Sequence, residues 1–359
     1  LRYNTGSNNT AIGYVALDAN TTASSNTAVG ESALGANTTG GDNTAVGGSA
    51  LTTNTTGARN TGIGQNALLV NTTGANNTAV GQGALEANTT ASDNAAFGHD
   101  SLVANTTGTQ NAAYGYRSMP ANTTGDKNTA IGHQALGANT TADDNTAVGY
   151  NSLVLNTTGA ENIAVGYQSL DSNTTGTENV GIGVNALGAN TTGGDNVAIG
   201  KSSLFANTTT GSHTAVGYRS MQCNTSGDAN TAVGKCSLFT NTTGCYNVTV
   251  GVNSLKLLTT GCCNVAVGKD AGENTTTGTN NHSFGFAACA SSATVSNEIT
   301  LGNSSNNNLR CADTSISSLS DLRDKTNVED IPHGLDYILA LRPVKFDWNT
   351  RDGTRIGKK

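Results

Sequence analysis

The 359 residues carry a formal net charge of −7, with 35% hydrophobic, 12% charged and 4% aromatic residues, 45 Gly and 3 Pro. An ordinary globular domain has about 45–50% apolar and about 25% charged residues, so this composition excludes one. The low charge also excludes a chain kept unfolded by self-repulsion. Because the chain has no initiator Met and opens inside a repeat at Leu1, we expect a fragment of a longer protein.

A 17-residue repeat occupies most of the chain. Each repeat carries a Gly that closes a block resembling N-T-A-V-G, and consecutive Gly residues are 17 positions apart without insertion or deletion. Such a fixed period is typical of solenoid proteins. The Gly residues are Gly13, Gly30, Gly47, Gly64, Gly81, Gly98, Gly115, Gly132, Gly149, Gly166, Gly183, Gly200, Gly217, Gly234, Gly251, Gly268, Gly285 and Gly302.

The consensus is N-T-A-V-G-x-x-(A/S)-L-x-x-N-T-T-G-x-x, and it predicts β structure. Thr, Asn, Gly and Val are poor helix formers, whereas short β segments bounded by Asn and Gly fit the pattern. We therefore predict an all-β parallel solenoid or β-roll with one coil per 17 residues. Val29 and Leu34 represent the two expected core columns. The small Ala28 is expected where a neighbouring chain comes close.

Each chain is expected to coil by itself, because Val and Leu recur within one period. Stacking would then place successive coils about 4.8 Å apart, whereas three interwound chains would require about 14 Å per repeat. The predicted organisation is a repeat shaft over 1–302, a junction over 303–320 and the start of a small α/β domain over 321–359. In that last part Pro332 suits a helix start, and Val344, Phe346 and Trp348 alternate as in a strand.

The block N-T-A-V-G-x-x-A-L resembles the head repeats of trimeric autotransporter adhesins. That resemblance covers about residues 9–302 and implies a parallel β-roll built by three chains. The period here is longer than in that family, because N-T-T-G is added. The chain is therefore expected to form a homotrimer.

The end of the chain is similar to the junction that precedes phage endosialidase-type intramolecular chaperones. The similarity rests on S-D-L-R-D-K at 320–325, G-L-D-Y-I at 334–338 and L-R-P-V at 341–344. It implies a tail fibre or tailspike whose chaperone assembles the trimer and then cuts itself off. By that resemblance Ser320 is the nucleophile at its bond to Asp321, and Lys325 is the base. The alternative is that Ser320 and Asp321 cap a helix.

Fourteen Asn residues in the N-T-T segments match the N-glycosylation signal. They permit a dense glycan coat, although Asn in a left-handed turn beside stacked Thr explains the same pattern. An ice-binding Thr surface is a weaker alternative, because adjacent Thr side chains face opposite sides. The candidate acceptors are Asn20, Asn37, Asn54, Asn71, Asn88, Asn105, Asn122, Asn139, Asn156, Asn173, Asn190, Asn207, Asn224 and Asn241.

The seven Cys residues lie in the last part of the chain without a zinc-ligand spacing. Cys245 and Cys262 are one period apart and are a candidate disulfide pair; buried free thiols are the alternative. The five His residues are interpreted as surface residues. The Tyr residues that follow the Gly, such as Tyr150, could bind sugars, but spaced surface aromatics without a ligand are the favoured interpretation. We expect no metal and no cofactor.

Two classes of function fit these features. The first is a phage tail fibre or spike shaft on the virion surface that serves attachment to a host-surface glycan or receptor. The second is an extracellular filament or surface adhesin, glycosylated or not, that assembles end to end. Neither class is an enzyme beyond a single self-cleavage. No basic patch indicates nucleic acid, and no run of about 18 apolar residues indicates a membrane span. The chaperone-like end favours the first class.

Overall fold

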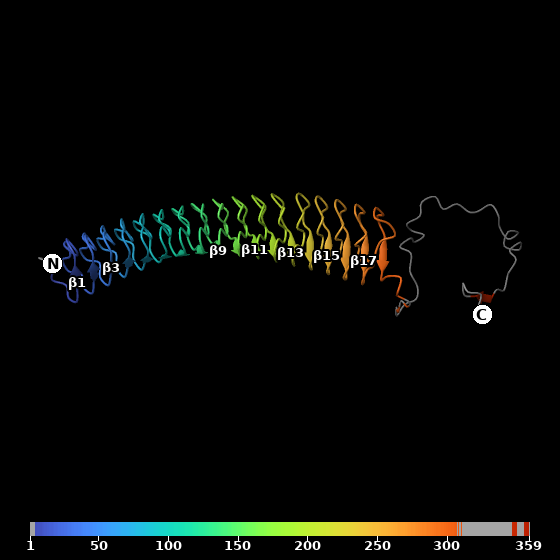
Figure 1. Cartoon of the computed structure of the whole chain (residues 1–359), viewed down its shortest axis with the longest axis horizontal. Helices are drawn as coiled ribbons and strands as arrows, with labels where there is room; N and C mark the ends of the chain where they lie inside the picture. The colour runs from blue at the N-terminus through green and yellow to red at the C-terminus, as the bar shows by residue number, and fades with distance from the viewer. Residues whose placement is uncertain (1–3, 307, 309, 311–346, 350–354, 359) are drawn as a thin grey trace, which may run out of the picture. The chain divides into compact units, whose positions relative to one another are not determined.

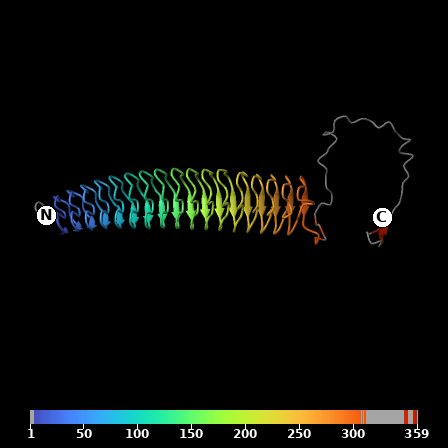
Figure 2. The same ribbon diagram turned by 45° about the horizontal axis from the view of Figure 1, so that its top comes forward.

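The computed structural model describes residues 4–306, 308, 310, 347–349 and 355–358. The chain divides into two compact units, Leu1–Asn307 and Asn308–Lys359. The first unit is a β-solenoid in which eighteen three-residue strands follow one another along a rod (Figure 1). In a view turned by 45°, the strand arrows form one continuous row along the rod (Figure 2). The described residues contain strands and turns but no helix.

Every strand of the solenoid has three residues. They are β1 Thr10–Ile12, β2 Thr27–Val29, β3 Thr44–Val46, β4 Thr61–Ile63, β5 Thr78–Val80, β6 Ala95–Phe97, β7 Ala112–Tyr114, β8 Thr129–Ile131, β9 Thr146–Val148, β10 Ile163–Val165, β11 Val180–Ile182, β12 Val197–Ile199, β13 Thr214–Val216, β14 Thr231–Val233, β15 Val248–Val250, β16 Val265–Val267, β17 His282–Phe284 and β18 Ile299–Leu301. In the second unit β19 Asp347–Asn349 pairs antiparallel with β20 Arg355–Lys358.

Consecutive coils of the same chain are hydrogen-bonded neighbours in parallel register. Thr27 pairs with Thr44, Ala28 with Ala45 and Val29 with Val46, and the same 17-residue offset holds from β1 to β18. The predictions of an all-β solenoid and of a chain that coils by itself are confirmed. The predicted helix start at Pro332 lies outside the described residues.

The Gly after each strand from β1 to β16 turns the chain with φ between +130° and +140°. A Cβ added at Gly30 would clash with the backbone carbonyl of Gly47 in the next coil, so no side chain fits there. Both the positive φ and the close approach therefore require Gly at this corner. Because all coils stack in the same register, the requirement repeats at every coil.

The Leu column is the apolar core, as predicted. Leu34, Leu51 and their equivalents are fully buried. These residues have φ near +52°, a left-handed conformation that costs roughly 1–2 kcal/mol for a non-Gly residue. Full burial of a Leu side chain contributes about 1.5–3 kcal/mol and offsets that cost. Since β-branched residues fit this conformation poorly, the position holds Leu or Met from Leu17 to Leu255.

The second predicted core column was wrong. The central residue of each strand from β2 to β17, usually Ala, points inward and is buried, whereas the Val or Ile before the Gly points outward: Val46 is 36% exposed and Ile63 39%. The coil is too thin for two large residues. At Gly62, which replaces the Ala, an added Cβ would already lie 3.3 Å from Leu51 Cδ1. Leu thus fills the interior, and only Ala, Gly or a small polar residue fits opposite.

Two columns of buried Asn complete the interior. In the first, Asn37 Nδ2 donates to Asn20 Oδ1 of the preceding coil at 2.8 Å and to the carbonyl of Gly40 at 2.9 Å. In the second, Asn43 Oδ1 accepts from the backbone N–H of Asn60 at 2.9 Å. The columns pair backbone groups that the short strands leave free. The Asn of the N-T-T segments, such as Asn37, was expected to have a left-handed backbone, and this was wrong. In that part of the coil the positive φ is at Asp42 and its equivalents.

Candidate functional surfaces

A continuous apolar stripe runs along the outside of the strand row, and we call it the strand stripe. It consists of the last residue of each strand from Ile12 to Leu301, all of them Val, Ile, Leu, Phe or Tyr. Eleven of the eighteen are exposed, as Val250 (40%) and Ile131 (43%), and the other seven are half-buried. Monomeric proteins rarely expose contiguous apolar surface over such a length, and surfaces of this kind are typical of sites where proteins associate.

The strand stripe has uncharged neighbours. The first residue of each strand also points outward, and it is Thr, Ala, Ile, Val or His in all eighteen strands. At the chain's average of 12% charged residues, the thirty-six outward positions of β1–β18 would carry about four charges. They carry none. The charges lie instead on the turns and on the segment after the Gly corner, for example Asp144, Glu161 and Lys201.

An aromatic column covers the position after the Gly corner in the middle of the rod. Its rings stack in order, with centroids 5.6 Å apart for His99 and Tyr116, 5.3 Å for Tyr116 and His133, 5.1 Å for His133 and Tyr150, and 5.3 Å for Tyr150 and Tyr167. The interpretation as spaced aromatics was wrong here. Since each inner ring has neighbours on both faces, only ring edges and hydroxyls remain for a ligand. Stacking on sugar rings is therefore disfavoured.

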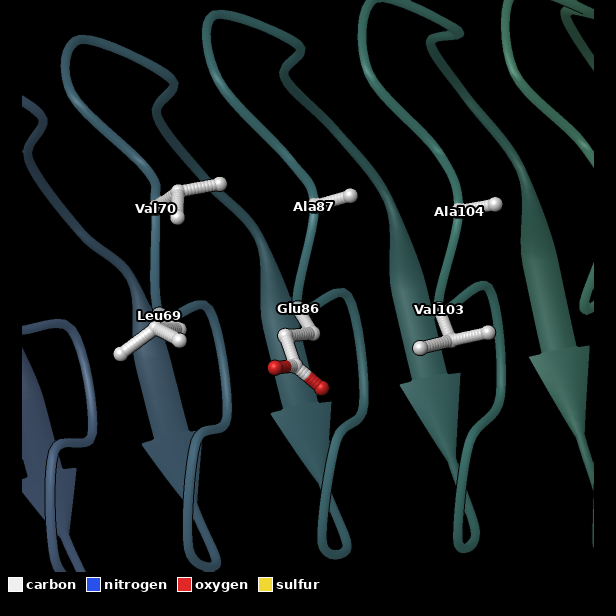
Figure 3. Close-up of a pocket in the computed structure, with 6 residues that line it drawn as sticks. All are labelled: Leu69, Val70, Glu86, Ala87, Val103 and Ala104. Carbon is white, nitrogen blue, oxygen red and sulfur yellow. The ribbon is translucent and has the colours of Figure 1, made fainter.

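A shallow groove lies on the segment that follows each Leu, which we call the return segment. Leu69 and Val70, Glu86 and Ala87, and Val103 and Ala104 line it, two residues from each of three successive coils (Figure 3). Glu86 carries the groove's only charge and projects among apolar side chains (Figure 3). The groove therefore lacks the converging polar groups of a catalytic or small-ligand site.

The fourteen candidate glycosylation residues form the first Asn column. Their side chains are at most 1% exposed, and Nδ2, the atom that would carry a glycan, is hydrogen-bonded. In Asn139, for example, it donates to Asn122 Oδ1 at 2.9 Å and to the carbonyl of Ala142 at 3.1 Å. A glycan on the folded coil would break this network, so the geometry argues against the hypothesis. Glycosylation of these Asn residues before the chain folds stays a prediction, which mass spectrometry can test.

Cys245 and Cys262 lie side by side on adjacent coils. Their Sγ atoms are 2.9 Å apart, and the backbone N–H of Cys245 points at Cys262 Sγ at 3.2 Å. The hydrogen bond with Cys262 raises the pKa of the Cys245 thiol to about 11. The raised pKa makes the Cys245 thiol a poor source of the attacking thiolate. The disulfide between Cys245 and Cys262 remains a prediction, and the neighbouring positions of the two Sγ atoms favour it.

Of the four His residues that the structure describes, one lies inside. His213 is 1% exposed and occupies a position of the second Asn column. Its Nδ1 accepts from the backbone N–H of Asn230 at 3.1 Å, and its Nε2 lies 3.1 Å from Thr210 Oγ1. Burial lowers its pKa below the ordinary value, while the Asp228 carboxylate opposes the shift. The surface assignment was wrong for this residue. The 17-residue register that places it in an Asn column was visible in the sequence.

Ser320, Asp321 and Lys325 lie outside the described residues, so their geometry is not described. Among the residues that the structure does describe, no group of three His, Cys, Asp or Glu side chains is arranged to bind a metal. The same part of the chain contains no helix that is long and apolar enough to cross a membrane.

Residues 320–358 match the family model of the chaperone of endosialidase, peptidase family S74. The match begins at Ser320, the predicted nucleophile. No curated protein and no solved structure matches the chain. A β-solenoid followed by such a chaperone domain fits a tail-fibre-like structural protein with an intramolecular chaperone. This chaperone type is associated with self-cleavage and indicates a virion-associated protein.

Proposed function

We propose that the chain is the shaft of a homotrimeric tail fibre or spike that projects from a virion and serves attachment to a host-surface glycan or receptor. The observation that carries the proposal is the order of its parts: an unbroken solenoid of eighteen strands, then a chaperone-of-endosialidase segment from residue 320. A uniform rod is suited to holding a binding tip at a distance. The uncharged strand stripe supports self-association.

The shaft is then assembled by the chaperone, which leaves by cleavage between Ser320 and Asp321. In this reaction the Ser320 hydroxyl acts as nucleophile and Lys325 as the base that takes its proton. One water is consumed overall, and the products are a carboxylate on Ser320 and an amine on Asp321. Removal of the chaperone makes assembly one-way, because the released shaft cannot refold by the same route.

Expression of the full-length gene tests this proposal. The wild type should give a shortened shaft on denaturing electrophoresis and a trimer by light scattering. Ser320→Ala and Lys325→Ala should leave the chain uncut while trimers still form, and Ser318→Ala is the matched control that should be cut normally. A wild type that forms stable trimers at full length would show that cleavage at this bond is wrong. A wild-type monomer would reject the fibre.

The alternative of an end-to-end filament receives no specific support from the structure. Its main argument was a glycan coat on the Asn-Thr-Thr segments, and those Asn side chains are buried and hydrogen-bonded. Mass spectrometry of the native Asn-Thr-Thr peptides decides whether any of them is modified.

A further inference from the structure

We propose that the strand stripe is the surface on which three copies of this chain meet, so that the outward Val and Ile residues form a second core between subunits. This inference rests on the proposed homotrimer and assigns its contact face. Each chain then has two cores. Leu and Ala fill the inside of every coil, and the strand stripe is covered only on association.

The first argument is apolar area. A buried Val, Ile or Leu side chain removes roughly 100 Å² from water, so exposure near 40% leaves about 40 Å² on each. Eighteen such residues give about 700 Å² per chain. In a trimer this area is shared between two neighbours, about 350 Å² for each, whereas a standard pairwise interface buries about 800 Å² per partner. The stripe can therefore supply nearly half of each contact, and the flanking first residues of the strands lie beside it to extend it.

The second argument is charge. Association along the strand face desolvates no Asp, Glu, Lys or Arg, because its thirty-six outward positions contain none. Apolar residues also lie on the return segment and after the Gly corner, but both faces carry charges. The return segment has Glu86, Asp171 and Lys256, and the position after the Gly has Lys201, Lys235 and Lys269. Burying unpaired charges there would be costly. The strand face is thus the one on which a long contact forms without that cost.

The third argument is that the apolar surface widens toward the C-terminal half of the solenoid. Up to β9 the first residue of each strand is Thr or Ala, and at Ile163, Val180 and Val197 it becomes a large aliphatic residue. Val248 and Val265 repeat the change. A second apolar column thereby runs beside the strand stripe in coils nearer, along the chain, to the segment that matches the chaperone.

Photocrosslinking at two matched Phe positions tests the assignment. Phe284 belongs to the strand stripe and is 39% exposed, and Phe205 lies on the return segment and is 37% exposed. In the full-length protein, p-benzoylphenylalanine in place of Phe284 should give strong intersubunit crosslinks on irradiation. The same residue in place of Phe205 should give at most a tenth of that yield. Light scattering on each variant checks that the oligomer forms before irradiation.

The outcomes separate the inference from the proposed function. Trimers that crosslink from Phe284 and not from Phe205 support the assigned face. Trimers that crosslink equally from both positions, or only from Phe205, overturn the assigned face and leave the fibre proposal intact. An unsubstituted protein that is monomeric by light scattering rejects both.

Discussion

Replacing Asn139 by Ala should destabilise the solenoid more than any surface change, because this side chain links three coils. Its Nδ2 donates to Asn122 Oδ1, and its own Oδ1 accepts from Asn156 Nδ2 at 3.2 Å. The truncation leaves Asn122 Oδ1 and one N–H of Asn156 buried without partners. Each such group costs about 1–3 kcal/mol, so the expected loss is about 2–6 kcal/mol. The carbonyl of Ala142 keeps its bond from Asn128 and adds little.

Two further variants make the test specific. Thr141→Ala alters an exposed side chain two residues away and should change stability by at most about 0.5 kcal/mol. Asn139→Leu should cost less than Ala, because the natural Leu258 shows that an apolar residue fits this column. Leu leaves the same two groups of Asn122 and Asn156 without partners as Ala does, but it fills the space; Asn241 Oδ1 beside Leu258 is a natural example of such an orphaned acceptor.

The assay is urea denaturation combined with hydrogen exchange of the amides in the coils that flank residue 139. Exchange is needed because each coil contacts only its neighbours and a solenoid opens locally. If Asn139→Ala falls within about 0.5 kcal/mol of Thr141→Ala, the Asn column does not hold the coils together, and the estimate from orphaned groups is refuted.

Three other predictions concern the Leu column, the Cys pair and the buried His. Leu153→Ala should cost about 2–5 kcal/mol in thermal or urea unfolding, whereas Tyr150→Ala, which removes an exposed ring stacked on His133 and Tyr167, should cost only about 1 kcal/mol; equal effects would mean that the inward face is misassigned. Oxidised glutathione should join Cys245 to Cys262, with both electrons passing to the glutathione disulfide, and raise stability by about 3 kcal/mol; free thiols on non-reducing peptide mapping would reject the pair. Because burial lowers the pKa of His213 below 6.5, the unfolded chain takes up the proton first, and stability should be full above about pH 6.5 and fall as pH drops below it. His213→Asn should remove that pH dependence of the melting temperature, and an unchanged dependence would exclude His213 as its source.

The period was sufficient to predict the fold, but it did not decide which strand residues face inward. In T-A-V the alternation places either Ala alone or both Thr and Val inside, and larger residues are buried more often. The outcome depends on Leu34 and its equivalents, whose left-handed backbone directs them across the coil. The packing of Leu against the central Ala of the strand is a tertiary contact, and the sequence of one repeat does not show it.

Other features were readable in principle from the 17-residue register. His213 and Leu258 stand where the columns otherwise hold Asn, and His99, Tyr116 and His133 follow one another at the same period. Aligning columns, rather than searching for motifs, would have found the buried His and the stacked rings. The 17-residue register ends near residue 302 and gives no information about the cleavage residues. Their assignment depends on the similarity to the chaperone family alone.

The regularity that makes the rod easy to fold also explains why a separate assembly domain is needed. Each coil pairs with residues only 17 positions away, so a chain can coil without long-range search. The strand stripe, however, looks nearly the same after a shift of one coil, about 4.8 Å. Side chains of similar shape at every step specify register weakly. Under the proposed function, three shafts would associate in many staggered alignments, and a domain that trimerises at one end removes this ambiguity. Under the same proposal the chaperone is not needed once the register is set, and its removal would leave the shaft intact.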